Sequence, residues 1–256
     1  MIWFPDPVAF SIGPCDIRWY GLAYVFGMFF SWFYGRQCIK NGYFSAISVK
    51  DWDNLMNCLT LGIVVGGRLG YFVLYSVDTF WNNPLEILQI WHPGMAFHGG
   101  LLGGVTAIFL YAHRHKVAFL ALLDVVAVST PIGLFLGRIA NFINQEHCGR
   151  LTDMPWGVVF PMLPDGPRHP CQLYEAGLEG IVLFLILMGI MRCSKRLCHG
   201  QLGGMFVILY GVMRLFTECF RMPDGLWHGV TLGQWYSMPG ILLGVVLWGA
   251  SRKKGH

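Results

Sequence analysis

The chain has few charged residues and lacks the local patterns that mark several large classes of enzymes. Only 12% of its 256 residues are charged, against about 25% in soluble domains, whereas 55% are hydrophobic. It contains no phosphate-binding P-loop, no dinucleotide fingerprint and no Gly-x-Ser-x-Gly elbow. Its basic residues form no patch interleaved with aromatics, so we expect no nucleic-acid partner. These absences favour an integral membrane protein over a soluble nucleotide-dependent enzyme or hydrolase.

Cysteines in metal-binding or redox patterns are also absent. The eight cysteines form no Cys-x-x-Cys pair, and no second histidine or carboxylate stands at metal-ligand spacing from His98. We therefore expect no metal and no other cofactor. Cys148 and Cys171 fall in one segment that we expect outside the membrane, where a disulfide between them is one interpretation and two small apolar core residues are the other.

The sequence contains several long apolar runs. Each is close to the ~20 residues that a helix needs to cross a bilayer. Met1–Pro14 lacks a basic n-region, so we expect no cleavable signal peptide. The sequence predicts an all-α membrane protein with about seven transmembrane helices, as a single domain over residues 1–256. The apolar runs cover residues 17–37, 56–75, 95–112, 118–138, 173–191, 202–221 and 233–250.

The lysines indicate the orientation of the chain. All six follow alternate apolar runs, at Lys40, Lys50, Lys116, Lys195, Lys253 and Lys254. Basic loops stay in the cytoplasm, so we expect the N-terminus outside and the C-terminus in the cytoplasm. The longest connection, residues 139–172, then lies outside. Its five prolines oppose one continuous helix, so we expect a small periplasmic cap or a pair of short arms.

Several charged residues interrupt the apolar runs. Arg214 and Glu218 stand four residues apart and can pair along one helix face, with Tyr210 one turn earlier on that face. Charges inside a membrane are functional candidates by default. Ion pairs that merely hold helices together are the alternative for the acidic members. The interrupting residues are Arg68, Asp124, Arg138, Glu175, Glu179, Arg214 and Glu218.

The stretch Gly137–Gly149 combines polar groups at the end of an apolar run. Arg138 and Asn141 share a helix face, and the helix is expected to open into a loop near Glu146. A guanidinium there needs a partner such as a phosphate or carboxylate, which Arg binds in a bidentate way. The alternative is an arginine that snorkels to the lipid headgroups. His98, between glycines at the start of another run, has a side chain suited to proton transfer near neutral pH.

These stretches together resemble the bacterial prolipoprotein diacylglyceryl transferase family. The chain departs from the family pattern at Ala140, Cys148 and Cys171, and its external segment before Arg168 is short. None of these differences touches the polar residues above. The matching stretches run in order along nearly the whole chain: Arg18–Gly21, Gly67–Tyr71, Phe97–Leu101, Gly137–Gly149, Arg168–Glu175 and Arg214–Asp224.

The resemblance implies an inner-membrane enzyme with seven helices and a cavity that opens toward the periplasm. It implies transfer of diacylglycerol from phosphatidylglycerol to the lipobox cysteine of a prolipoprotein signal peptide, with release of glycerol phosphate. Membrane lipids surround such an enzyme. By resemblance the catalytic residues are His98, Arg138 and Arg214. The substrate-binding residues are Tyr20, Arg138, Asn141, Glu146, Gly149, Tyr210, Arg214, Glu218 and Arg221.

The implied chemistry gives these residues distinct roles. His98, or alternatively an arginine, would activate the substrate thiol. Arg138 and Arg214 would hold the departing phosphate, Asn141 and Tyr210 would bind its glycerol head, and Glu218 would orient Arg214. Two other classes remain open on the residues alone. A transporter or flippase for an anionic lipid would use the same arginines and would be favoured by inverted repeats. A scaffold protein would use the charges as structural ion pairs.

Overall fold

The structure is a computed structural model that describes residues 4–13, 15–89, 92, 94–194, 197–223 and 225–253. The residues named above that lie outside these ranges are Met1, Pro14, Lys195, Asp224 and Lys254. The chain forms two compact units, one of Met1–Gly35 with Asp124–His256 and the other of Arg36–Leu123. Each unit is described by itself.

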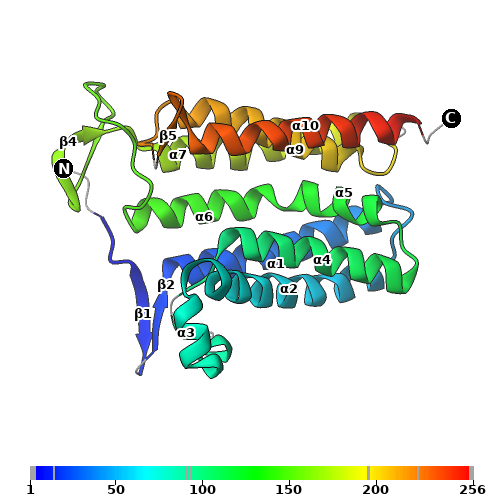
Figure 1. Ribbon diagram of the computed structural model, residues 1–256. Coiled ribbons are helices and arrows are strands. Elements are labelled where there is room, and N and C mark those ends of the chain that lie inside the picture. The colour runs from blue at the N-terminus through cyan, green and yellow to red at the C-terminus, as the bar shows by residue number, and fades with distance from the viewer. Residues whose placement is uncertain are drawn as a thin grey trace. The chain divides into compact units, whose positions relative to one another are not determined.

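Two long helices form the unit of Arg36–Leu123. They are α2 (Val49–Tyr75) and α4 (Phe97–His115), which pack against each other (Figure 1). α2 begins at a capping box, because the Ser48 hydroxyl accepts from the Asp51 N–H at 3.1 Å while the Asp51 carboxylate accepts from the Ser48 N–H at 3.3 Å. This reciprocal pair of hydrogen bonds places the start of α2 two turns before the apolar run 56–75, from which the helix was predicted.

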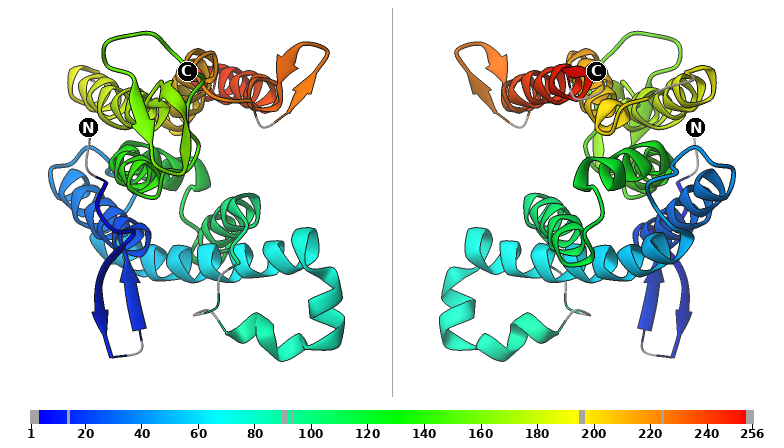
Figure 2. Two further views of the ribbon diagram at one scale, coloured as in Figure 1. Left: turned by 90° about the vertical axis from the view of Figure 1, so that its left-hand side faces the viewer. Right: turned by 90° about the vertical axis from the view of Figure 1, so that its right-hand side faces the viewer.

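Arg68 organises the loop between α2 and α4. The loop contains α3 (Val77–Asn82) and η1 (Pro84–Leu88) and extends away from the end of α2 (Figure 2). The residue is 3% exposed, and its guanidinium donates to five backbone carbonyls, among them those of Gln89 and Gly94 at 2.8 Å each. Arg68, a candidate intramembrane charge in the sequence, therefore satisfies the polar backbone of an irregular loop.

The other unit begins with an antiparallel hairpin of β1 (Val8–Ile12) and β2 (Cys15–Arg18), which runs directly into α1 (Trp19–Lys40). The chain returns to this unit within α5 (Phe119–Ser129), which is followed by α6 (Pro131–Ile143), and the two helices are bent by 44° where they meet. The bend has a simple cause, because a proline at the first position of α6 has no N–H to continue the hydrogen bonding of α5.

A second hairpin and a long helix with an irregular middle follow α6. The strands β3 (Val158–Phe160) and β4 (Leu163–Arg168) pair antiparallel within the segment expected to be a cap. The helix then runs from residue 171 to residue 193, and its central turn is π-helical, a form common at functional sites. Its parts are α7 (Cys171–Glu175), the π-helical η2 (Ala176–Val182) and α8 (Leu183–Cys193).

Two helices that lie side by side complete this unit (Figure 1). They are α9 (Gln201–Glu218) and α10 (Leu232–Lys253). A short hairpin of β5 (Leu226–Trp227) and β6 (Val230–Thr231) connects them and extends beyond their ends (Figure 2). Its turn residues have positive φ, as two-residue hairpin turns require.

The architecture is mostly helical, as predicted, and a helix overlaps every apolar run. Two details of the prediction are wrong. The described part of the chain is not strictly all-α, because it holds three hairpins, and the run 118–138 is a bent helix pair rather than one helix. By length and composition, α2 and the helix 171–193 are able to cross a membrane, and α5 with α6 would make a third, broken span.

Candidate functional site

Six charged side chains from separate stretches of the chain meet in the unit that contains α6 to α10. α6 supplies one arginine, the helix 171–193 supplies two glutamates, and α9 with the residues after it supplies the rest. We call this group the arginine–glutamate cluster. Its members are Arg138, Arg214, Arg221, Glu175, Glu179 and Glu218.

Arg138 joins two carboxylates. Its Nη1 lies 2.9 Å from Oε2 of Glu175, and its Nη2 lies 3.1 Å from Oε2 of Glu179. Both glutamate side chains are 0% exposed. The charged end of Arg138 therefore faces buried carboxylates, so the snorkelling alternative does not describe this residue.

The two glutamates face the arginines because of where they stand on their helix. Glu175 ends α7 and Glu179 lies one turn later, inside the π-helical η2. Residues four apart share a helix face, so both carboxylates project toward the same neighbours. Arg214 pairs with both of them, by a direct contact to Oε1 of Glu175 and at 3.8 Å from Oε1 of Glu179.

Arg214 also pairs along its own helix, as the sequence predicted. Its Nη2 lies 2.9 Å from Oε2 of Glu218, four residues later. The Glu218 carboxylate packs against α10 at Gly233. A Cβ added to Gly233 would lie 2.5 Å from the carboxyl carbon of Glu218. A larger residue at position 233 would require the Glu218 carboxylate to move, and no sequence pattern singled out Gly233.

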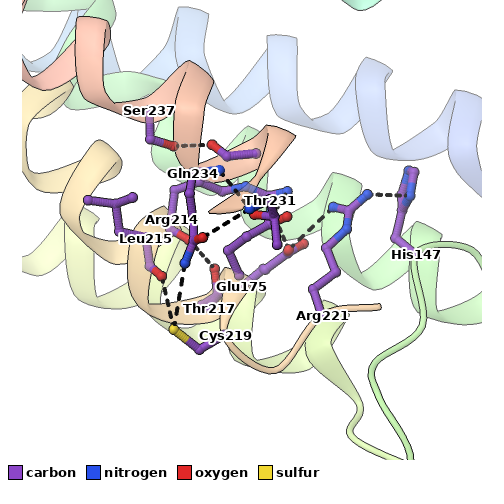
Figure 3. A network of polar contacts seen from close by, with 12 residues as sticks. His147, Glu175, Arg214, Leu215, Thr217, Cys219, Arg221, Thr231, Gln234 and Ser237 are labelled. Carbon is purple, nitrogen blue, oxygen red and sulfur yellow. Dashed lines mark hydrogen bonds and ion pairs between the residues drawn. The ribbon is translucent and has the colours of Figure 1, made fainter. Parts of the chain in front are cut away.

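Arg221 joins the cluster through Glu175 and also contacts a histidine of the loop after α6. Its Nη1 lies 3.6 Å from Oε1 of Glu175, and its Nη2 lies 2.8 Å from Nδ1 of His147 (Figure 3). Glu175 therefore contacts all three arginines of the cluster. It is the central carboxylate of the group.

The cluster contains three guanidinium groups and three carboxylates, so its formal charges balance. Side-chain exposure is 17% or less for every member. Removing one partner from such a buried group leaves an uncompensated charge, which costs about 3–5 kcal/mol. An anion that enters must therefore share guanidinium contacts with the carboxylates, which stay in the cluster as part of the chain.

The last turn of α6 and the loop after it hold three further predicted site residues. The Asn141 side-chain amide donates to Oε2 of Glu146 at 2.9 Å. The Gly149 N–H donates to the carbonyl of His169 at 3.1 Å, and a Cβ on Gly149 would lie 2.7 Å from Sγ of Cys171. Glu146 thus orients Asn141, and Gly149 lets the loop approach the start of α7. Their roles toward substrate stay predictions.

The two predicted tyrosines flank the cluster. Tyr210 precedes Arg214 by one turn on α9 and lies within electrostatic range of Arg138. The Tyr20 hydroxyl lies 3.4 Å from that of Tyr24, which is itself within electrostatic range of Arg138. Tyr210 therefore lies near the cluster, and Tyr20 lies beside Tyr24 in the same region.

His98 belongs to the other compact unit. It is the second residue of α4, it is exposed, and its ring lies 5.6 Å from that of Phe97 between centroids. Its role as the group that activates the thiol stays a prediction.

Asp124 has a structural partner. Its carboxylate accepts from the backbone N–H groups of Gly200 at 2.6 Å and Gly203 at 2.7 Å, at the start of α9. An acidic group at a helix N-terminus satisfies N–H groups that have no partner inside the helix. The packing interpretation therefore describes Asp124, which anchors the helix that carries Arg214.

Cys148 and Cys171 are free, buried thiols, so the disulfide interpretation is not realised. Burial raises the pKa of the Cys148 thiol, which disfavours the nucleophilic thiolate. Cys148 packs with Val158 and Phe160, and Cys171 is the first residue of α7, four residues before Glu175.

Sequence reasoning recognised Glu175 and Glu179 as charges in an apolar run but gave them no role at the site. Their spacing of four residues in one apolar run, together with arginines in other apolar runs, was the available signal. His147 carried no comparable signal, because only the fold brings it to Arg221.

Comparisons with known proteins point to a single family. The family model described as prolipoprotein diacylglyceryl transferase matches residues 7–250. A protein named phosphatidylglycerol--prolipoprotein diacylglyceryl transferase from Bordetella parapertussis is 45% identical over 255 residues, which cover 97% of each chain. Proteins of the same name from Nitrobacter winogradskyi and Wolbachia pipientis subsp. Culex pipiens are 45% and 44% identical. These matches cover 98% and 95% of this chain, and 89% and 94% of the relatives.

Proposed function

Because this chain belongs to the prolipoprotein diacylglyceryl transferase family, we propose that it transfers the diacylglyceryl group of phosphatidylglycerol to the lipobox cysteine of a prolipoprotein. In this reaction the cysteine sulfur forms a bond to C3 of the glyceryl group. The bond from C3 to the phosphate oxygen breaks, and glycerol phosphate leaves with the electron pair. The thiol proton passes to a base, for which His98 is the candidate and an arginine the alternative.

One observation carries the proposal for the site. Three arginines from α6, α9 and the residues after α9 converge on the buried carboxylate of Glu175. A phosphate diester presents anionic oxygens of the kind that a guanidinium fork binds. The headgroup would take over part of the contacts now made by carboxylates, and negative charge that develops on the departing phosphate would meet donors already in place.

The remaining polar residues would orient the headgroup. Asn141, fixed by Glu146, and Tyr210 would hydrogen-bond the glycerol head, with Tyr20 at the edge of the same region. Glu218 would keep Arg214 in its orientation. In the structure Asn141 is held by Glu146, and Arg214 is held by Glu218.

We propose the topology of the family for the chain as well. Residues 1–256 would form one membrane domain with seven crossings in the inner membrane. The N-terminus would be periplasmic and the C-terminus cytoplasmic, because the lysines follow alternate apolar runs. The segment 139–172, with its β3–β4 hairpin, would form the periplasmic cap.

The test is transfer by the purified protein in detergent or liposomes. Phosphatidylglycerol and a lipobox peptide are supplied, and the diacylglyceryl thioether is measured by mass together with released glycerol phosphate. Phosphatidylethanolamine in place of phosphatidylglycerol, and a peptide with serine in place of cysteine, should give no product. A folded protein that moves lipid between leaflets without forming thioether would refute the proposal in favour of a flippase.

A further inference from the structure

His147 contacts the arginine–glutamate cluster directly, although it lies in a loop. The loop connects α6 to β3, and His147 has a φ of 56° there. Its Nδ1 lies 2.8 Å from Nη2 of Arg221, whose Nη1 lies 3.6 Å from Oε1 of Glu175 (Figure 3). The Arg221 side chain is 6% exposed. Its guanidinium therefore contacts both a carboxylate and an imidazole.

We propose that His147 is a positioning residue for the transfer reaction, whose neutral imidazole holds the Arg221 guanidinium and whose protonation releases it. The proposal rests on the proposed function of the cluster. Protonation of His147 would then change the arginine–glutamate cluster, although His147 does not itself react with the substrate.

The chemistry of the contact determines the protonation state. A guanidinium has N–H groups that donate and no acceptor, so Nδ1 of His147 must be the acceptor. A neutral imidazole that accepts at Nδ1 carries its proton on Nε2. Neither nitrogen can then take the substrate thiol proton while the Arg221 contact persists, so His147 is not the base. A proton added to Nδ1 would replace the acceptor by a donor and place two cations in contact.

Charged groups lie near His147 both in the cluster and along its own loop. Arg221 and Glu175 lie on the side of the cluster, while Glu146 and Arg150 are its near neighbours in the chain. The backbone of Arg221 is held independently, because it pairs with Gly149 and its carbonyl accepts from Nε of Arg150 at 3.0 Å. Loss of the imidazole should therefore displace the guanidinium and leave the loop in place.

Two substitutions test the proposal. His147→Gly keeps a residue that tolerates positive φ but removes the acceptor. His147→Asn also tolerates positive φ, and its carbonyl oxygen can accept from Arg221 without titrating. We expect His147→Gly to lower kcat/KM by about 10-fold near pH 8 and His147→Asn to restore most of that loss.

The pH profile provides a measurement that a structural role would not change. The rate of the parent relative to His147→Asn should fall as pH drops from about 8 to about 5.5, because only the parent loses its acceptor on protonation. His228→Asn is the matched control, since His228 is also exposed and also has positive φ, at 49°, in the turn between β5 and β6. This control should follow the parent at each pH.

The outcomes separate this proposal from the proposed function. A parent protein that forms no thioether from phosphatidylglycerol would refute the function. An active parent whose rate relative to His147→Asn stays constant with pH, or a folded His147→Gly at the parent rate, would refute the role of His147 alone. If His147→Gly is too unstable to assay, the ratio of the parent to His147→Asn decides.

Discussion

Replacing Arg138 by lysine tests whether the cluster needs the shape of a guanidinium or merely a positive charge. Arg138 uses two nitrogens to reach two different glutamates, at 2.9 Å and 3.1 Å. Lysine keeps the charge but offers a single nitrogen. The lysine ammonium can form a charge-assisted hydrogen bond to Glu175 or to Glu179. It lacks the planar guanidinium that bridges both carboxylates.

The expected magnitude follows from the contacts that are lost. One hydrogen bond to a charged group contributes about 1.5–3 kcal/mol, so the free energy of unfolding should fall by roughly this amount. The loss of a donor to the departing phosphate costs about 3 kcal/mol of barrier, which corresponds to a decrease of about 100-fold in rate. We therefore expect Arg138→Lys to stay folded at lower thermal stability and to lose most of its transfer activity.

The measurement is thioether formation per folded molecule, with monodispersity and thermal stability determined on the same sample. Arg114→Lys is the control, because Arg114 is an exposed residue near the end of α4, in the other compact unit. It should match the parent in rate and stability. An Arg138→Lys protein that is less stable but turns over at the parent rate would show that Arg138 holds helices together and does not contact the phosphate.

Three further predictions concern α10, the cysteines and the orientation. Gly233→Ala should lower stability by about 1–3 kcal/mol and reduce transfer, because its Cβ would displace the Glu218 carboxylate, whereas Gly240→Ala on the same helix meets nothing within 4 Å and should be neutral. A folded variant with all eight cysteines replaced by serine or alanine should keep its turnover, and inactivity would place a cysteine in the chemistry. Reporter fusions after Lys116 and Trp81 should indicate cytoplasm and periplasm respectively, and the reverse labelling would contradict the proposed orientation.

The helices were predictable because apolar runs of spanning length are local features of the sequence. α9, for example, overlaps the run that predicted it, and the pairing of Arg214 with Glu218 follows from their spacing on one helix. The break before Pro131 was readable in principle, since proline interrupts helical hydrogen bonding, but apolar composition alone predicted one continuous helix. The short hairpins were missed because strands of two to six residues leave little periodic signal beside the long apolar runs.

The amino-acid sequence by itself determined that the chain is a membrane protein of this family and which charges interrupt its apolar runs, because both are properties of composition and of motifs in order. Tertiary structure decided which of those charges meet. Arg138, Glu175 and Arg214 stand on three different helices, and no spacing along the chain places a guanidinium against a particular carboxylate. The packing of these helices buries the three side chains together, and burial makes their pairing necessary, because an unpaired charge there is costly. The contact of His147 with Arg221 likewise exists because a loop folds back on the cluster.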